Sequence, residues 1–191
     1  METQKANKTV HSVFTAFFAA LISVGAFISI PAGPLGISIV LQNMLCVLSG
    51  CILGGIQGAA AVGLFIAAGA VGLPIFAGGN GGFHVLFGPV GGFYYGYFLA
   101  ALVAGFIAGK PKLTDKKISP AYATRIALAS LAGFVLIYAP AIPWAMAKTG
   151  KSLPTIFAGY VAPFLVGDTI KMVATIFLSL ILRPIAARYL K

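Results

Sequence analysis

Acidic residues are almost missing from this sequence. Three Asp and Glu stand against 13 Lys and Arg, and charged residues make up only 8% of the 191 positions, whereas a soluble domain carries about 25%. With so few acids, general acid–base catalysis has almost no candidates. The sequence also lacks an HExxH motif, a DDxxD-like run, a Ser/His/Asp set and a nucleotide-binding loop. We therefore expect no enzyme, no catalytic residue and no pump that hydrolyses ATP by itself.

Cysteine is equally scarce. Cys46 and Cys51 lie five residues apart in one apolar segment, which places them about 140° apart around a helix. They cannot comfortably pair with each other, and no CxxC pattern or histidine nearby completes a metal site. The sequence thus predicts two inert thiols, no metal and no cofactor.

Long polar stretches are missing too, so the chain has no room for a sizeable water-soluble module. Hydrophobic residues make up 60% of it, and the mean hydropathy is +1.01. Most of its apolar segments reach the ~20 residues needed to cross the hydrocarbon core of a bilayer. They are residues 12–30, 37–53, 55–73, 87–108, 121–139 and 161–182. We predict an all-α integral membrane protein in which residues 1–191 form one domain of six transmembrane helices.

The basic residues behind the net charge of +10 lie where they would set the orientation of the chain in a membrane. They therefore do not predict a nucleic-acid partner. If the N-terminus is cytoplasmic, ten basic residues lie inside and two outside, as the positive-inside rule requires. The ten are Lys5, Lys8, Lys110, Lys112, Lys116, Lys117, Arg125, Arg183, Arg188 and Lys191, and the two are Lys148 and Lys151. We expect a multi-pass protein of the cell membrane with both termini in the cytoplasm.

This orientation sorts the loops. Residues 31–36, 74–88 and 140–160 are rich in Gly and Pro, poor in charge, and all predicted to lie outside. Irregular backbone at membrane depth is tolerated where it lines a cavity or is covered by protein. The sequence therefore predicts a ligand pocket near the extracellular side.

Asp168 and Lys171 are charges within the last apolar segment. Each would cost about 2.5–3.5 kcal/mol at the centre of a bilayer. Three residues apart on a helix, they share a face and can meet each other or a common ligand. A structural ion pair is one alternative, and a Lys171 that snorkels to the interface is another. We favour a polar binding site, because Gly and Pro precede the pair and an asparagine stands in another outer loop.

That asparagine is Asn80, which sits in a glycine block over residues 78–82. Glycines such as Gly79 and Gly82 allow backbone conformations and close approach to a ligand that other residues resist. Asn80 could read an amide or urea group, since it both donates and accepts hydrogen bonds. A plain turn is the alternative. His84 lacks acidic or cysteine companions nearby, which favours a packed or interfacial residue over a ligand or proton carrier.

Aromatic residues flank these loops. Tyr94 near the outer end of the fourth segment could belong to an interfacial belt or line the pocket. Pro140 and Pro143 are expected to break the fifth helix at the outer interface. Trp144 beside them is most often an interface anchor, and it could instead stack on an apolar ring in a roofed pocket.

Small residues mark two helix faces. Ala16 and Ala20 form a small-xxx-small step that allows close helix approach in lipid, either within the chain or to another membrane protein. The fourth segment has small residues at every fourth position, and this stripe should contact more than one neighbour because it drifts around the helix. The stripe is Gly88, Gly92, Gly96, Ala100, Ala104 and Ala108.

Together these motifs resemble the BioY family, the biotin-binding S components of energy-coupling factor (ECF) transporters. The resemblance rests on GGNGG at 78–82, GPVGGF at 88–93, the GDxxK element at 167–171 and the Ala16/Ala20 pair, and it covers essentially the whole chain. It implies a six-helix membrane fold with high biotin affinity. It also implies a module of one further membrane subunit and two ABC-type ATPases, which a face like Ala16/Ala20 would contact.

Biotin chemistry agrees with the candidate residues. Asp168 would accept from the urea N–H groups, and Asn80 or Lys171 would donate to the urea oxygen. Lys171 could instead neutralise Asp168 or attract the carboxylate tail. Tyr94 and Trp144 are predicted walls around the ring. Two alternatives stay open: an S component for another small vitamin, and a stand-alone proton-coupled carrier that uses Asp168 and His84.

Overall fold

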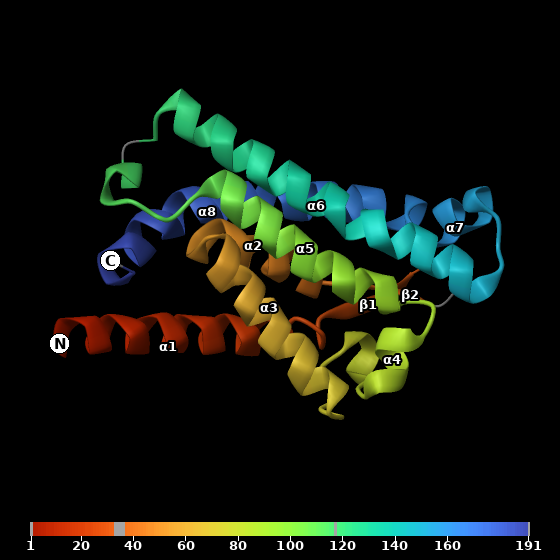
Figure 1. Cartoon of the computed structure of the whole chain (residues 1–191). Helices are drawn as coiled ribbons and strands as arrows, with labels where there is room; N and C mark the ends of the chain where they lie inside the picture. The colour runs from red at the N-terminus through yellow and green to blue at the C-terminus, as the bar shows by residue number, and fades with distance from the viewer. Residues whose placement is uncertain (1, 33–36, 117, 191) are drawn as a thin grey trace.

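The computed structural model describes residues 2–32, 37–116 and 118–190, and most of them are helical (Figure 1). The α-helices are α1 Glu2–Val24, α2 Gln42–Leu53, α3 Gly55–Ala70, α4 Phe83–Phe87, α5 Gly91–Ala108, α6 Pro120–Thr149, α7 Leu153–Tyr160 and α8 Leu165–Tyr189. Short 3-10 turns are η1 Ala77–Gly79, η2 Leu113–Lys116 and η3 Ala162–Phe164. The predicted helical fold is confirmed.

One short hairpin departs from that prediction. β1 (Ser29–Ala32) and β2 (Ile37–Val40) pair antiparallel, with Ser29 opposite Val40 and Ala32 opposite Ile37. Ser29 and Ile30 fall in the predicted first span, Pro31 and Ala32 in the predicted loop 31–36, and β2 at the start of the predicted second span. Pro31 disfavours a helix interior, and the β-branched residues of both segments favour extended backbone. The first helix therefore ends at Val24, and the second begins only at Gln42.

The expected break at Pro140 and Pro143 is wrong. Both prolines lie inside α6, which continues to Thr149 and ends at Gly150 in the left-handed conformation, with φ 66°. A proline removes one helix hydrogen bond, but close packing holds α6 together here. A Cβ added at Gly92 of α5 would lie 2.8 Å from the carbonyl oxygen of Pro140, so the backbones of the two helices are in contact there.

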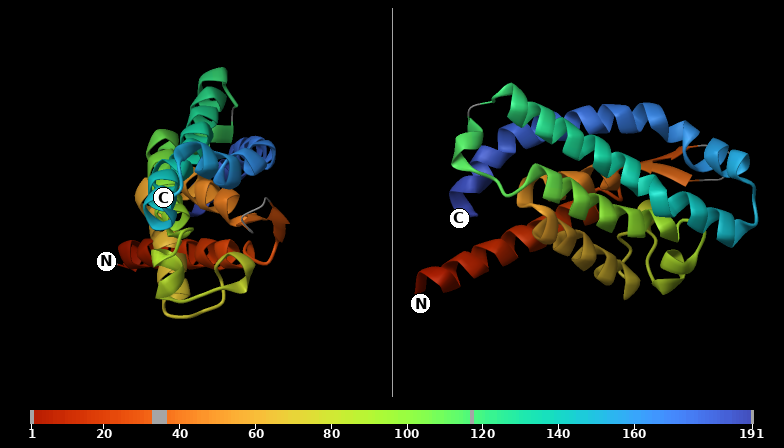
Figure 2. Two further views of the ribbon diagram at one scale, coloured as in Figure 1. Left: turned by 90° about the vertical axis from the view of Figure 1, so that its right-hand side faces the viewer. Right: turned by 45° about the horizontal axis from the view of Figure 1, so that its top comes forward.

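The helices form a bundle with two distinct ends. α5 packs against α6, α2 and α3, and α8 packs against α2 and α6. Both termini lie at one end, and the hairpin, α4 and α7 lie at the other (Figure 1). The second view in Figure 2 shows α5, α6 and α8 extending lengthwise between these ends, with α6 antiparallel to the other two. α1 lies on the outside against α2 and α3.

Small residues set the close helix contacts, as the stripe predicted. A Cβ at Gly96 would lie 2.3 Å from the Ile137 carbonyl oxygen on α6. Ala100, Ala104 and Ala108 further along α5 are fully buried. At Gly50 of α2, a Cβ would lie 2.1 Å from the carbonyl oxygen of Ala101. α5 therefore makes backbone-level contact with more than one neighbour.

Span lengths are uneven. Within the described residues, three helical segments are long and apolar enough to cross a membrane: 91–108, 120–149 and 153–189. Three further apolar helices, 9–24, 42–53 and 55–70, are shorter than that criterion. α2, with 12 residues, is about 18 Å long, against a hydrocarbon core of about 30 Å.

The end that carries the termini contains a buried cation. Arg183, counted above among the orienting charges, has no exposed surface. Its guanidinium pairs with Asp115 of η2 at 3.4 Å and lies 5.9 Å from the ring centre of Tyr122. It also donates to four carbonyl oxygens at the ends of α2 and α5, those of Cys51, Ala108, Gly109 and Lys110. We refer to Arg183, Asp115 and Tyr122 as the Arg183 cluster.

Candidate functional site

A cavity of about 480 Å³ lies at the opposite end of the bundle, where α2, α5 and α8 begin. This volume is within the range of small-molecule sites, about 300–1,000 Å³. Its lining residues come from β2, α2, the 77–80 loop, α4, residues 89–90, the start of α5, α6, α7, η3 and α8. They are Val40, Asn43, Ala77, Gly78, Asn80, Val85, Pro89, Val90, Phe93, Tyr94, Tyr97, Ile137, Tyr138, Tyr160, Phe164, Asp168 and Lys171.

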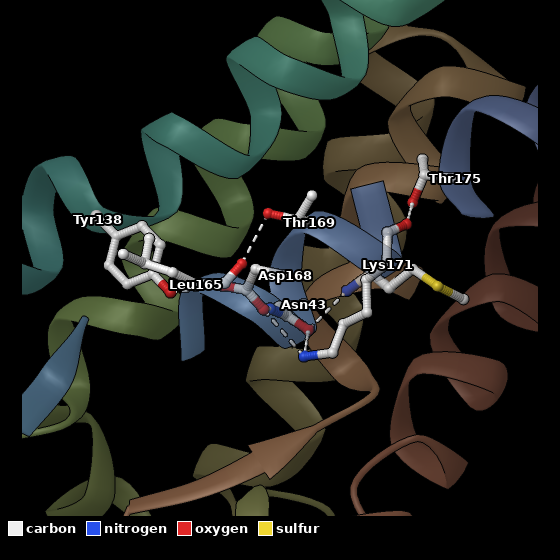
Figure 3. A network of polar contacts seen from close by, with 8 residues as sticks. Asn43, Tyr138, Leu165, Asp168, Thr169, Lys171 and Thr175 are labelled. Atoms are coloured by element: carbon white, nitrogen blue, oxygen red, sulfur yellow. Dashed lines mark hydrogen bonds and ion pairs between the residues drawn. The ribbon is translucent and has the colours of Figure 1, made fainter. Parts of the chain in front are cut away.

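Asp168 and Lys171 are the charged residues among these, and they form an ion pair with Nζ 3.0 Å from Oδ1. Asn43 of α2 joins them (Figure 3). Its amide nitrogen donates to Asp168 Oδ1 at 2.8 Å, and its oxygen accepts from Lys171 Nζ at 3.0 Å. The hydroxyl of Tyr138 on α6 donates to Asp168 Oδ2 at 2.5 Å. Three helices thus hold one polar network, with both charged side chains about nine-tenths buried.

The network retains capacity for a guest molecule. A carboxylate offers about four acceptor sites, and an ammonium group has three donors. Asp168 accepts three bonds and Lys171 Nζ donates two. One N–H of Lys171, one N–H of the Asn43 amide and one lone pair on Asp168 remain for a ligand. Donors and an acceptor therefore lie side by side, an arrangement that suits a group in which N–H adjoins C=O.

Aromatic rings surround this polar floor. Phe93 and Tyr160 stack with ring centres 6.3 Å apart and planes 5° apart, and Phe93 meets Tyr138 edge-on at 6.0 Å. Tyr94 also lines the pocket and is 3% exposed. Phe164 at the start of α8 completes this set. Flat apolar walls of this kind fit a compact ring system.

The 77–80 loop lies at the mouth. Asn80 and Gly78 line the pocket and are exposed. The Asn80 amide donates to the Ala77 carbonyl oxygen at 2.8 Å, so the residue makes a turn and still presents its carbonyl oxygen to a ligand. The backbone N–H of Ala77 donates to the Tyr94 hydroxyl at 3.3 Å. Gly79 and Gly82 have φ of 74° and 100°. Only glycine adopts such angles easily, so these two residues shape the loop. Neither of them belongs to the lining set.

Two other predicted residues lie elsewhere. Trp144 is not among the lining residues. Its indole N–H donates to the Gly88 carbonyl oxygen at 2.9 Å, and its ring lies 5.1 Å from Lys148 Nζ. His84 is exposed on α4, also outside the lining set. The structure thus separates His84 from the Asp168 network.

Ala16 and Ala20 are exposed on α1, whereas Phe18, Ala19 and Ile22 of the same helix face the bundle. Exposed Val13 and Phe17 flank them. The pair therefore does not pack inside this chain, and its face is open to lipid or to another membrane protein.

Sequence reasoning missed Asn43 and Tyr138. Asn43 stands next to Gln42 in an otherwise apolar run, and the cost argument applied to Asp168 would also have singled it out. Gln42 itself is fully buried and donates to the Ile75 carbonyl oxygen at 2.8 Å, which fixes the start of the loop at the mouth. For Tyr138 the sequence offers no comparable signal, because tyrosines are common near membrane interfaces.

Comparisons with known proteins agree with one another. Residues 1–188 match the model of the BioY family. The biotin transporter BioY of Thermotoga maritima is 38% identical over 168 residues, which cover 88% of this chain and 92% of that protein. The biotin transporter BioY of Rhodobacter capsulatus is 36% identical, with 89% of each chain covered. A crystal structure of the S component for biotin from an ECF-type ABC transporter superposes with a TM-score of 0.77 at 29% identity, covering 92% of both chains.

Proposed function

Because the chain belongs to the BioY family, we propose that it is the biotin-binding S component of an ECF-type uptake transporter. It is a transport protein of the membrane and not an enzyme. The observation that carries the proposal is the Asp168–Asn43–Lys171 network at the floor of an aromatic pocket.

The ureido ring of biotin matches the free capacity of this network. One urea N–H donates to the remaining lone pair of Asp168. The urea oxygen accepts from Lys171 and from the second N–H of Asn43. The bicyclic ring then lies among Phe93, Tyr94 and the neighbouring aromatic residues. A site built to hydrogen-bond such groups rejects analogues that lack them, because its buried polar atoms would be left unpaired.

Asn80 is proposed to bind from the mouth, where its free carbonyl oxygen accepts from the ligand or from water held against it. Gly79 and Gly82 allow the loop to approach closely. Trp144 acts through the pocket rim, since its bond to Gly88 holds the segment that leads to Pro89 and Val90 of the lining. Its role is thus to position the wall, in place of the direct stacking expected from the sequence.

Energy coupling requires partners. ECF transporters supply them as a membrane-embedded T subunit and two ABC-type ATPases, and we assign the exposed Ala16/Ala20 face of α1 to the T subunit. Small residues on an exposed helix face permit close helix contact in lipid. The proposal includes six spans with both termini in the cytoplasm and the pocket outside. The separation of these features along the bundle supports it. The Lys110–Lys116 loop and both termini lie at one end, and the pocket lies at the other.

The test is biotin binding to purified protein by titration calorimetry, with mass spectrometry of any small molecule that co-purifies. Asp168→Asn should weaken biotin binding tenfold or more, because a hydrogen bond to a charged group contributes about 1.5–3 kcal/mol. Thr169→Ser on the exposed face of α8 is the matched control and should bind as the parent does. Unchanged affinity in Asp168→Asn would reject the assigned role, and another vitamin in the co-purified fraction would reject biotin.

A further inference from the structure

The charge distribution of the pocket bears on which forms of the ligand are accepted, and this inference rests on the proposed function. Asp168 and Lys171 are the charged groups among the described lining residues, and they neutralise each other at 3.0 Å. Residues 29–39, the hairpin with its connection, contain no charged residue in the sequence. Lys148 and Lys151 are exposed and do not belong to the lining set. Within the part of the chain that the structure describes, the pocket thus contains no cation other than Lys171, which already pairs with Asp168.

The two ends of the cavity differ in character. The charged pair lies at the buried floor, where both side chains are about nine-tenths covered. Gly78, Asn80 and Pro89 are the exposed lining residues and mark the mouth. A ligand whose urea group meets the floor directs its tail toward this mouth. Among the described lining residues, the polar groups at the mouth are the Asn80 side chain and the backbone of the 77–80 loop, all of them uncharged.

An unpaired carboxylate is disfavoured inside an apolar cavity, so the tail carboxylate stays in contact with water at the mouth. A tail amide at the mouth can form hydrogen bonds equally well. The Asn80 carbonyl oxygen can accept from its N–H, and water can bond to its remaining polar atoms. We propose that this pocket selects the ureido ring and not the charge of the tail, so that it also binds carboxamides of biotin, including biotin joined to the side-chain amine of lysine.

The experiment is competition against labelled biotin with the full chain in lipid nanodiscs, prepared from cells grown without excess biotin. The competitors are biotin, biotin amide, biotinyl-lysine and 2-iminobiotin. The two amides should compete within about tenfold of biotin itself. Iminobiotin should compete at least tenfold more weakly, because it replaces the urea oxygen that Lys171 and Asn43 would contact with a donor.

Each outcome decides something. If biotin does not bind, the proposed function fails. If biotin binds and both amides lose more than tenfold, the proposed function stands and this inference fails, since the loss of a charge-assisted bond weakens binding by roughly ten- to a hundredfold. If iminobiotin binds as tightly as biotin, the assignment of the urea to the floor is wrong, and the inference fails with it.

Lys171→Met provides an independent measurement. If Lys171 bonds to the urea group at the floor, its loss weakens the binding of biotin and of biotin amide by the same factor. If Lys171 pairs with the tail carboxylate, the substitution weakens biotin alone, and the ratio of the two affinities changes. A changed ratio would overturn the inference even if both compounds bind the parent protein.

Discussion

Arg183 offers the sharpest test of how the bundle is held together away from the pocket. Replacement by Met retains much of the length and apolar volume of the side chain but removes every donor. The guanidinium is fully buried, pairs with Asp115 at 3.4 Å, and donates to carbonyl oxygens that terminate α2 and α5. Arg183→Met therefore leaves a buried carboxylate and several helix-end carbonyls without this partner.

The expected loss of stability in Arg183→Met follows from the burial of the ion pair. An exposed ion pair contributes about 0–1 kcal/mol, whereas removal of one partner from a buried pair costs about 3–5 kcal/mol. Arg183 is 0% exposed and its partner Asp115 is 5% exposed, so the larger range applies. For a chain of this size each kcal/mol lowers the melting temperature by about 2–4 °C. We expect a fall of about 10 °C.

The assay is thermal unfolding in detergent, followed by loss of tryptophan fluorescence or by aggregation. Arg188→Met is the matched control, since Arg188 is exposed on the same helix, and it should melt within about 2 °C of the parent protein because exposed charges contribute little. Biotin affinity of folded Arg183→Met should be unchanged, because the Arg183 cluster and the pocket lie at opposite ends. Equal melting temperatures for the two variants would refute the reasoning.

Two further predictions concern close helix contacts. Gly96→Ala should destabilise the protein by about 1–3 kcal/mol through overpacking, because the new Cβ would lie 2.3 Å from a backbone oxygen of α6. Gly63→Ala is the control, since its Cβ would meet nothing nearer than 3.5 Å. It should be neutral or slightly stabilising in the same melting assay. Ala16→Leu should reduce co-purification with the T subunit and leave biotin binding intact. Ala60→Leu on exposed α3 is its control, and equal co-purification of both variants would remove α1 from the proposed interface.

The sequence by itself determined the class of the protein and the residues at the centre of the candidate site. Its hydropathy and its shortage of acids predicted a membrane protein without catalytic machinery. A carboxylate and an amine in an apolar segment are costly in lipid, so Asp168 and Lys171 could be singled out before any fold was known. The motifs around residues 78–93 and 167–171 then led to the family.

Tertiary structure decided how those charges are satisfied. Asn43 and Asp168 are 125 positions apart, and Tyr138 and Asp168 are 30 apart. Helical periodicity relates neighbours within a segment and says nothing about which face of α2 or α6 meets α8. Packing also made Arg183 a buried partner of helix ends, kept α6 continuous through two prolines, and turned Trp144 toward Gly88. Each of these features depends on contacts between segments. There, burial and close approach of backbones outweigh the conformational preferences of the local sequence.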